Sequence, residues 1–187
     1  TFDNFSLSYY PNEPSDSGIS AYQQMEQILR YCKAYAAQFS MDAPNLLMQG
    51  GTGLGKTPLS LAIAHEAIEK GYGVIYGSAQ NMVTNLEKER FQKDNEQQDT
   101  NQLMLQCDLL IIDDLGTEFS TSFVTAAIYN IVNTRLMTHK PTIISTNLSM
   151  KELEERYTER FASRILGSYI PLFFRGKDIR QQKRRKK

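Results

Sequence analysis

Cysteine, long apolar runs and net charge are all scarce in this chain of 187 residues. The only cysteines, Cys32 and Cys107, are too few for a disulfide framework and follow no metal-ligand spacing. We therefore expect two buried free thiols in a reducing, cytoplasmic location. No apolar run approaches the roughly 18 residues that span a bilayer, and no signal segment opens the chain, so we expect no membrane partner. His65 and His139 show no ligand spacing, and we assign them no chemistry.

The 21 basic and 21 acidic residues cancel, so bulk charge gives no sign of a polyanionic partner. The distribution is uneven, however, because residues 175–187 carry eight Lys or Arg and a single acidic residue, Asp178. Such a basic tail could add salt-sensitive contacts with a nucleic-acid backbone, although terminal basic runs are often only disordered.

The length suits one α/β domain over residues 1–187, with a lead-in over 1–18 and the basic tail over 175–187. The first residue is Thr1 rather than Met, so we expect a preceding N-terminal portion that is absent from this sequence. A partner-binding domain in that portion would be invisible here.

Hydrophobic periodicity predicts strands that alternate with helices along the chain. We expect strands over 45–50, 73–77, 108–114, 141–147 and 169–174. We expect helices over 20–39, 55–70, 78–91, 121–138 and 149–166, the last as one or two helices, and a short helix that ends near Gln106 after an exposed connection over 93–102. The alternation predicts an α/β fold with a mainly parallel, doubly wound sheet.

Residues Gly50 to Thr57, GGTGLGKT, fit the phosphate-binding pattern G-x-x-x-x-G-K-[ST]. Because the motif follows a predicted strand and opens a predicted helix, its backbone N–H groups can converge on phosphate oxygens. Lys56 would add charge against the β- and γ-phosphates, and the Thr57 hydroxyl would ligate Mg²⁺. The alternative, a glycine-rich turn with a surface lysine, needs a chance match rarer than about one in a hundred. The candidate nucleotide-binding residues are Gly50, Gly51, Thr52, Gly53, Leu54, Gly55, Lys56, Thr57 and Pro58.

Two carboxylates end the predicted central strand in LLIIDDLG. At the carboxyl end of a strand beside a phosphate loop, Asp113 could hold Mg²⁺ and Asp114 could polarise an attacking water. Alone, two such aspartates would more often mark a turn or a helix start. Asn147 ends the next strand and could orient water or touch the γ-phosphate, or it could simply cap a loop.

Arg160 and Arg164 lie four residues apart, on one face of a predicted helix. Their guanidinium groups suit phosphate geometry. The alternative is a pair of surface salt bridges with Glu155 or Glu159.

The order of FDNF (2–5), GGTGLGKT, DLLIIDDLGTE (108–118), TIISTN (142–147) and ERFASRI (159–165) resembles the DnaC/DnaI-type helicase loaders. It equally resembles the related IstB-type transposition ATPases, and both groups are P-loop NTPases of the AAA+ class. The likeness covers nearly the whole chain. The run Asp-Asp-Leu-Gly is fairly specific to this branch, because most AAA+ ATPases place Glu at the second acidic position.

The resemblance implies a five-stranded sheet of order 5-1-4-3-2 with a lid that is short or absent. It implies that Asp114 is the catalytic carboxylate and Asn147 the sensor 1 residue. Arg164, with Arg160 beside it, would be the arginine finger that reaches a neighbour's ATP. Arg180 resembles the sensor 2 arginine, whereas the residues alone would place it in a solvated basic tail.

The same likeness implies a slow, partner-stimulated ATPase that forms an ATP-dependent homo-oligomer, binds single-stranded DNA and places the replicative helicase on DNA. The helicase-contacting region would precede Thr1. In these proteins the helical stretch after the second strand touches the DNA backbone. It contains Asn81, Asn85, Lys88 and Arg90, for which a solvated helix face is the alternative.

Two other functions stay open. An IstB-like transposition helper would share the fold and chemistry but would act with a transposase on duplex DNA. A nucleotide-binding adaptor with little hydrolysis is suggested by Pro58 and by the shorter carboxylate of Asp114. A metabolic kinase is disfavoured, because no acceptor-substrate pocket can be identified in the sequence.

Pro58 departs from the usual phosphate loop, because its nitrogen has no hydrogen to offer the α-phosphate. A hydrogen bond to a charged group is worth roughly 1.5–3 kcal/mol, so nucleotide binding should be weakened rather than abolished. Pro58→His is therefore expected to tighten binding of both ATP and ADP, measured by titration calorimetry. Affinities equal to those of the parent would contradict this interpretation.

Overall fold

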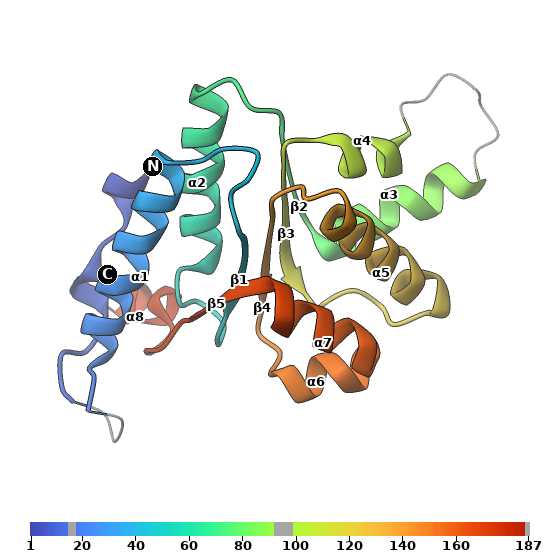
Figure 1. Ribbon diagram of the computed structural model, residues 1–187. Helices are drawn as coiled ribbons and strands as arrows, with labels where there is room; N and C mark the ends of the chain where they lie inside the picture. The colour runs from blue at the N-terminus through green and yellow to red at the C-terminus, as the bar shows by residue number, and fades with distance from the viewer. Residues whose placement is uncertain (15–17, 92–98, 186–187) are drawn as a thin grey trace.

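Five parallel strands form the centre of the computed structural model, which describes residues 1–14, 18–91 and 99–185 (Figure 1). The strands are β1 (Asn45–Gln49), β2 (Val74–Ser78), β3 (Leu109–Leu115), β4 (Thr142–Thr146) and β5 (Tyr169–Phe173). They lie in the order β2-β3-β4-β1-β5, and every neighbouring pair is parallel. This is the predicted order, and it gathers the carboxyl ends of β1, β3 and β4 at one edge of the sheet.

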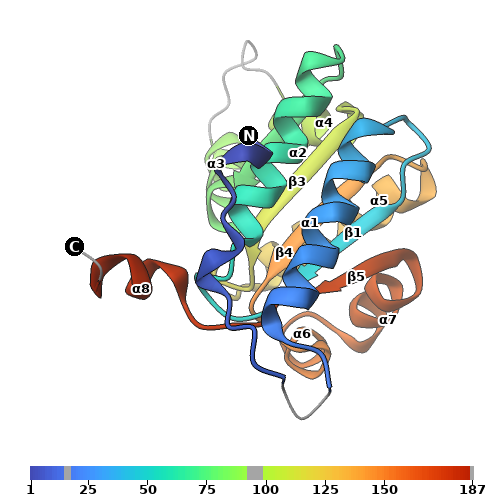
Figure 2. The same cartoon turned by 90° about the vertical axis from the view of Figure 1, so that its left-hand side faces the viewer.

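Helices cover both faces of the sheet (Figures 1 and 2). The helices α1 (Ala21–Ala37) and α2 (Lys56–Glu69) pack on one face. The other face is covered by α3 (Ala79–Phe91), α4 (Thr100–Gln106), α5 (Ser122–Met137), α6 (Met150–Arg156) and α7 (Glu159–Ser168). Two short 3₁₀ turns, η1 (Phe2–Asn4) and η2 (Leu7–Tyr9), precede α1, and α8 (Ile179–Arg185) follows β5.

The strands are apolar without alternation because both of their faces are covered. In β3, Leu109 and Ile111 belong to the core beneath α1 and α2, whereas Leu110 and Ile112 belong to the opposite core. All four side chains are fully buried. A central parallel strand requires this pattern, since successive side chains point to opposite faces.

Local capping explains two details that the hydrophobic pattern left open. The stretch 149–166 forms two helices, because Thr158 is in an extended conformation and its side chain caps the start of α7. The helix α4 begins at Thr100, inside the predicted connection over 93–102, because Asp99 accepts a hydrogen bond from the Gln102 amide. Residues 93–98 of that connection lie outside the described residues.

The prediction that both thiols are buried is wrong for Cys107. Cys32 is buried within the α1 core, but Cys107 is only half-buried, at the end of α4, and both thiols are free. Burial raises the pKa of the Cys32 thiol to about 12. Among the described helices, none is both long and apolar enough to cross a membrane.

After β5, the described residues include one short helix, α8. In Figure 2, α8 projects away from the body of the protein. The predicted basic tail over 175–187 therefore begins with residues outside any helix and continues as α8, and its last two residues lie outside the described part of the chain.

A fully buried arginine fastens α5 to α4 and β4. The guanidinium of Arg135 donates to the carbonyl of Met104 at 2.8 Å, the carbonyl of Pro141 at 2.7 Å and the hydroxyl of Thr142 at 2.9 Å. Met104 lies in the last turn of α4, where the helix dipole is negative and stabilises a cation. Arg135 therefore has carbonyl and hydroxyl acceptors, and in the described chain it forms no ion pair with a carboxylate.

Replacing this cation should destabilise the fold. Arg135→Met keeps much of the volume but leaves the buried carbonyls without donors, so the free energy of unfolding should fall by about 3 kcal/mol. Urea unfolding followed by circular dichroism measures this change. Lys140→Met is the matched control, because Lys140 also donates to a carbonyl of α4, that of Gln106, but at an exposed position. Equal stability of the two variants would show that the buried contacts add little.

Candidate nucleotide-binding site

The phosphate-loop motif connects β1 to α2 and is packed from both sides by distant parts of the chain. Gly53 has a φ of 73°, and a Cβ there would lie 2.1 Å from a carboxylate oxygen of Asp178. Gly55 has a φ of 95°, and a Cβ there would lie 2.7 Å from the ring of Phe5. Both positions favour glycine, because another residue would be strained at these positive φ values and would displace a neighbouring side chain. The loop is held between the N-terminal segment and the segment that precedes α8.

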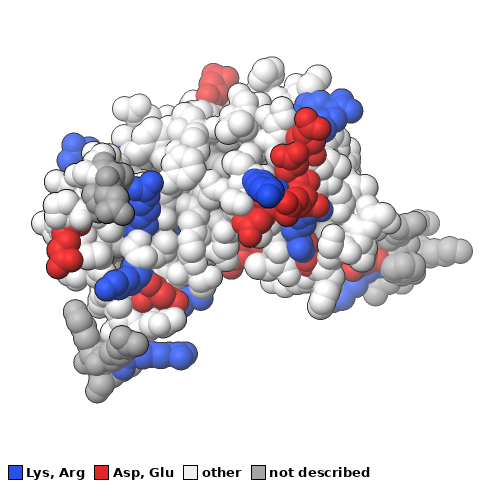
Figure 3. Space-filling model, turned by 90° about the horizontal axis from the view of Figure 1, so that it is seen from below, with Lys and Arg blue, Asp and Glu red and all other residues white. Residues whose placement is uncertain are grey.

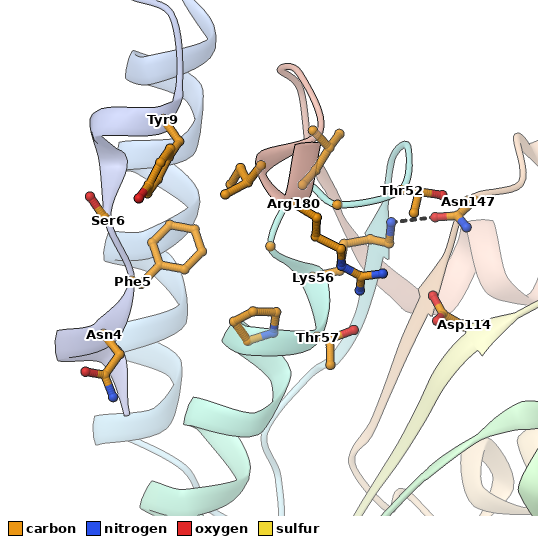
Figure 4. A pocket seen from close by; sticks show the side chains of 15 residues that line it. Asn4, Phe5, Ser6, Tyr9, Thr52, Lys56, Thr57, Asp114, Asn147 and Arg180 are labelled. Atoms are coloured by element: carbon orange, nitrogen blue, oxygen red, sulfur yellow. Dashed lines mark hydrogen bonds between the residues drawn. The ribbon is translucent and has the colours of Figure 1, made fainter. Parts of the chain in front are cut away.

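A pocket opens over this loop (Figure 4). Its walls come from the phosphate loop, the carboxyl ends of β3 and β4, η1 and η2 with the residues beside them, and the start of α8. The predicted residues that line it are Thr52, Gly53, Leu54, Gly55, Lys56, Thr57, Pro58, Asp114, Asn147 and Arg180. The structure therefore brings together most of the site that the sequence predicts.

Lys56 is buried beneath the loop and has three acceptors. Its Nζ donates to the carbonyl oxygens of Gly50 at 2.6 Å and Gly51 at 2.8 Å, and to Oδ1 of Asn147 at 2.6 Å. Burial lowers the pKa of the Lys56 ammonium, while the nearby Asp114 carboxylate opposes that shift. A phosphate oxygen that binds here would replace at least one of these acceptors.

Asp113 is buried at the end of β3 and accepts three hydroxyl groups. Its Oδ2 accepts from Thr57 at 2.8 Å and from Tyr76 at 2.7 Å, and its Oδ1 accepts from Ser145. Burial, followed by the bond to Asp113, raises the pKa of Tyr76, so the phenol stays protonated and donates. Neither Tyr76 nor Ser145 was predicted, because a tyrosine and a serine in strands carry no motif that marks them.

Asp114 turns its carboxylate into the pocket from an uncommon backbone conformation (Figure 4). Its φ is 52°, and the pairing of β3 with β4 shifts register between Ile112 and Leu115. The Asp114 amide donates to the Ser145 hydroxyl at 2.9 Å. A bulge of this kind redirects side chains, so adjacent aspartates can take different directions. Asp113 faces the hydroxyl groups and Asp114 faces the pocket.

The N-terminal aromatic residues divide between core and pocket. Phe2 and Tyr10 are buried in the core beside α1 and α2. The Tyr10 hydroxyl also donates to the carbonyl of Leu54 at 2.7 Å and so ties this segment to the phosphate loop. Phe5 and Tyr9 line the pocket, and Phe5 also packs against this core. The sequence offers no periodic signal in this segment that could have separated the two pairs.

The two arginines of α7, Arg160 and Arg164, lie outside the pocket over the phosphate loop of the same chain. The guanidinium carbons of Arg160 and Arg164 sit 6.0 and 5.9 Å from the centre of the Tyr129 ring. Neither residue lines the pocket over the phosphate loop. In the described part of the chain, the alternative salt bridges with Glu155 or Glu159 do not form either.

The four candidate DNA contacts lie on α3. Asn81, Asn85 and Lys88 are exposed, whereas the side chain of Arg90 lies outside the described residues. Figure 3 looks onto the edge where the strands end, where acidic side chains form one band with a few basic side chains beside it, while most other basic side chains lie apart from this band.

This fold and site define a P-loop NTPase domain of the AAA+ class. The family model of the IstB-like ATP-binding proteins matches residues 22–170, and the chain belongs to this family. The replicative helicase loader DnaC of Escherichia coli K12 is 28% identical over 149 residues, which are 78% of this chain and 60% of that protein. DnaC of Buchnera aphidicola subsp. Acyrthosiphon pisum is 26% identical over 175 residues, 92% of this chain and 71% of that protein.

Solved structures show the same fold. A crystal structure of the DnaC helicase loader superposes with a TM-score of 0.73 at 22% identity and covers 93% of this chain and 98% of that one. AMPPCP-bound DnaA from Aquifex aeolicus also reaches 0.73, at 20% identity, over 96% of this chain and 56% of that one. The comparisons thus confirm the resemblance to DnaC-type proteins related to IstB. The chain spans 60% of the length of the Escherichia coli relative.

Proposed function

We propose that this chain is the ATP-binding and ATP-hydrolysing domain of a DnaC-like replicative helicase loader, a primosome component that binds single-stranded DNA. One observation carries the proposal: Lys56, Thr57, Asp114, Asn147 and Arg180, from separate parts of the chain, line a single pocket over a phosphate loop. The similarity to DnaC over most of the chain supports the loader role. The helicase contact is assigned to a region that precedes Thr1.

The pocket suits a nucleoside triphosphate. The amides at the start of α2 and the Lys56 ammonium would hold the β- and γ-phosphates, because a helix N-terminus and a cation both favour anions. Arg180, which also lines the pocket, would add positive charge. The rings of Phe5 and Tyr9, on the N-terminal wall, would contact the adenine base.

Thr57 and Asp113 fit a Mg²⁺ ion. Their oxygens already lie 2.8 Å apart, and Mg²⁺ prefers hard oxygen ligands shared between one or two side chains, water and substrate phosphates. Among the described residues, no cluster of three or more His, Cys, Asp or Glu could hold a metal by itself. Bound there, the ion would neutralise charge on the phosphates.

Asp114 would orient the water that attacks the γ-phosphorus, and Asn147 would contact the γ-phosphate. The water oxygen bonds to phosphorus as the bond to the bridging oxygen breaks and that oxygen leaves with ADP; the released phosphate carries the new oxygen and one of its protons, and the other proton passes to solvent. Asp114 fits this role because its carboxylate, unlike that of Asp113, faces the pocket.

The arginine finger is assigned to Arg164, with Arg160 beside it, acting on the ATP of a neighbouring copy. Both residues lie outside their own pocket, and stacking on Tyr129 holds their side chains in place without neutralising them. This arrangement supports an ATP-dependent homo-oligomer. Asn81, Asn85 and Lys88 on α3 are the proposed DNA contacts, with Arg90 beside them.

An IstB-like transposition helper is the second candidate, favoured by the family match over residues 22–170. The two candidates share the pocket and differ in partner. Retention of a replicative helicase, but not of a transposase, by the protein with its preceding region would decide between them. A nucleotide-binding adaptor remains the third candidate, because Pro58 lines the pocket.

Stimulated hydrolysis tests the catalytic assignment. Asp114→Asn should lower DNA-stimulated turnover by about a hundredfold or more while ATP binding persists, since the water loses its orienting carboxylate. Phosphate release measured with and without single-stranded DNA and helicase gives the rate. Background turnover by the parent protein under every condition would favour the adaptor instead.

A mixing experiment tests the arginine in trans. Arg164→Ala should lower turnover at least about tenfold, because an arginine finger stabilises transition-state charge. Mixing this inactive variant with inactive Asp114→Asn should restore part of the activity, as each supplies what the neighbour lacks. Arg30→Ala, on the exposed side of α1, is the control and should match the parent. If the mixture is as inactive as each variant alone, Arg164 does not act on the ATP of a neighbouring copy.

A further inference from the structure

A buried carboxylate outside the pocket links the turn that carries Asp114 to the start of α7, the helix that carries Arg160 and Arg164. Glu118 lies three residues after β3 and is only 2% exposed. It does not line the nucleotide pocket, and neither the motif nor the proposed mechanism gives it a role. A buried carboxylate is costly unless donors satisfy its oxygens, so its partners indicate what it holds together.

Glu118 joins two separate parts of the chain. Its Oε2 accepts from the backbone amide of Gly116 at 2.9 Å. Its Oε1 accepts from the hydroxyl of Tyr157 and from Nε of Arg156 at 3.5 Å. Arg156 also donates through Nη2 to the backbone carbonyl of Glu118. All these donors belong to the chain itself.

One end of this network is the turn that carries Asp114. Gly116 has a φ of 102°, and a Cβ there would lie 2.4 Å from the Leu148 side chain. The Thr117 hydroxyl and amide both donate to the carbonyl of Asp114, at 2.8 and 3.2 Å. Asp114 itself has a positive φ, which non-glycine residues keep only when their surroundings enforce it. The hydrogen bond from the Gly116 amide to the Glu118 carboxylate helps to hold Asp114 in this conformation.

The other end is the joint between α6 and α7. Tyr157 follows the last residue of α6 and precedes Thr158, which caps α7. The Tyr157 and Phe161 rings lie 4.8 Å apart, so the tyrosine also packs on the first turn of α7. Burial, followed by the bond to Glu118, raises the pKa of Tyr157, which therefore remains a donor. The helix that presents Arg160 and Arg164 is thus tied to Glu118.

We propose that Glu118 is a positioning residue for ATP hydrolysis. It holds the Asp114 turn in its strained conformation and fixes this turn against the α6–α7 joint. The Asp114 carboxylate and the arginines of α7 therefore keep fixed positions relative to each other. The inference rests on the proposed ATPase function. It requires that the loss of this carboxylate impairs turnover much more than nucleotide binding.

Glu118→Gln is the decisive variant, because it keeps the shape but turns one acceptor into an NH₂ donor facing other donors. We expect kcat for DNA-stimulated hydrolysis to fall roughly ten- to a hundredfold, as misplaced catalytic groups do. The Kd of a fluorescent ATP analogue should change by less than about threefold, since the phosphate loop and Lys56 are untouched. Glu154→Gln, on the exposed side of α6, is the matched control and should leave both values unchanged.

Hydrogen exchange distinguishes a local loosening of the Asp114 turn from a loss of stability of the whole protein. In Glu118→Gln, exchange should speed up at the amides of residues 114–117, while the amides of the phosphate loop keep the protection of the parent. Parallel losses of kcat, ATP affinity and melting temperature, with faster exchange throughout, would show a merely structural residue and overturn the inference. In that case the parent's stimulated turnover would still uphold the proposed function.

Tyr157→Phe is the second variant, for use if Glu118→Gln does not fold. It removes one donor and keeps the ring against Phe161, so the fold should persist. A several-fold drop in kcat at constant Kd would support the positioning role. Turnover equal to the parent's would contradict it.

Discussion

The buried carboxylate of Asp113 is the interaction on which the site depends. It accepts hydroxyl groups from Thr57 on α2, Tyr76 on β2 and Ser145 on β4, and so connects the phosphate loop to three strands of the sheet. A buried anion is tolerated only when such donors surround it, so these elements cannot separate without exposing it. The Ser145 hydroxyl also accepts a hydrogen bond from the backbone amide of Asp114. The direction of the Asp114 carboxylate, the proposed catalytic group, thus depends on contacts centred on Asp113.

The strands, the phosphate loop and the acidic pair could be predicted because short-range patterns determine them. Because β3 is buried on both faces, its sequence is a continuous apolar run. The motif GGTGLGKT, which connects β1 to α2, marks the position at which phosphates are expected to bind. Parallel strands end at the same edge, so Asp113, Asp114 and Asn147 had to lie near the loop. The strand order followed from the resemblance to DnaC-type loaders rather than from the periodicity.

The remaining contacts join segments that no local pattern connects. Tyr10 meets Leu54 across 44 positions of sequence, and Glu118 meets Tyr157 across 39. A tyrosine or a glutamate alone gives no sign of such a partner, so the N-terminal wall of the pocket and the α6–α7 link could not be predicted. The arginines of α7 show the opposite case: their spacing was visible in the sequence, but their stacking on Tyr129 depends on how α5 and α7 pack.

A crystal structure with Mg²⁺ and a non-hydrolysable ATP analogue tests the central claim most directly. The account predicts the β- and γ-phosphates against the amides of residues 51–57 and the Lys56 ammonium, with the metal between Thr57 and the unmoved Asp113. It also predicts the Asp114 carboxylate on the side of the γ-phosphate away from ADP. An analogue bound elsewhere, or an Asp113 that has lost its hydroxyl partners and lies far from the metal, would contradict the account.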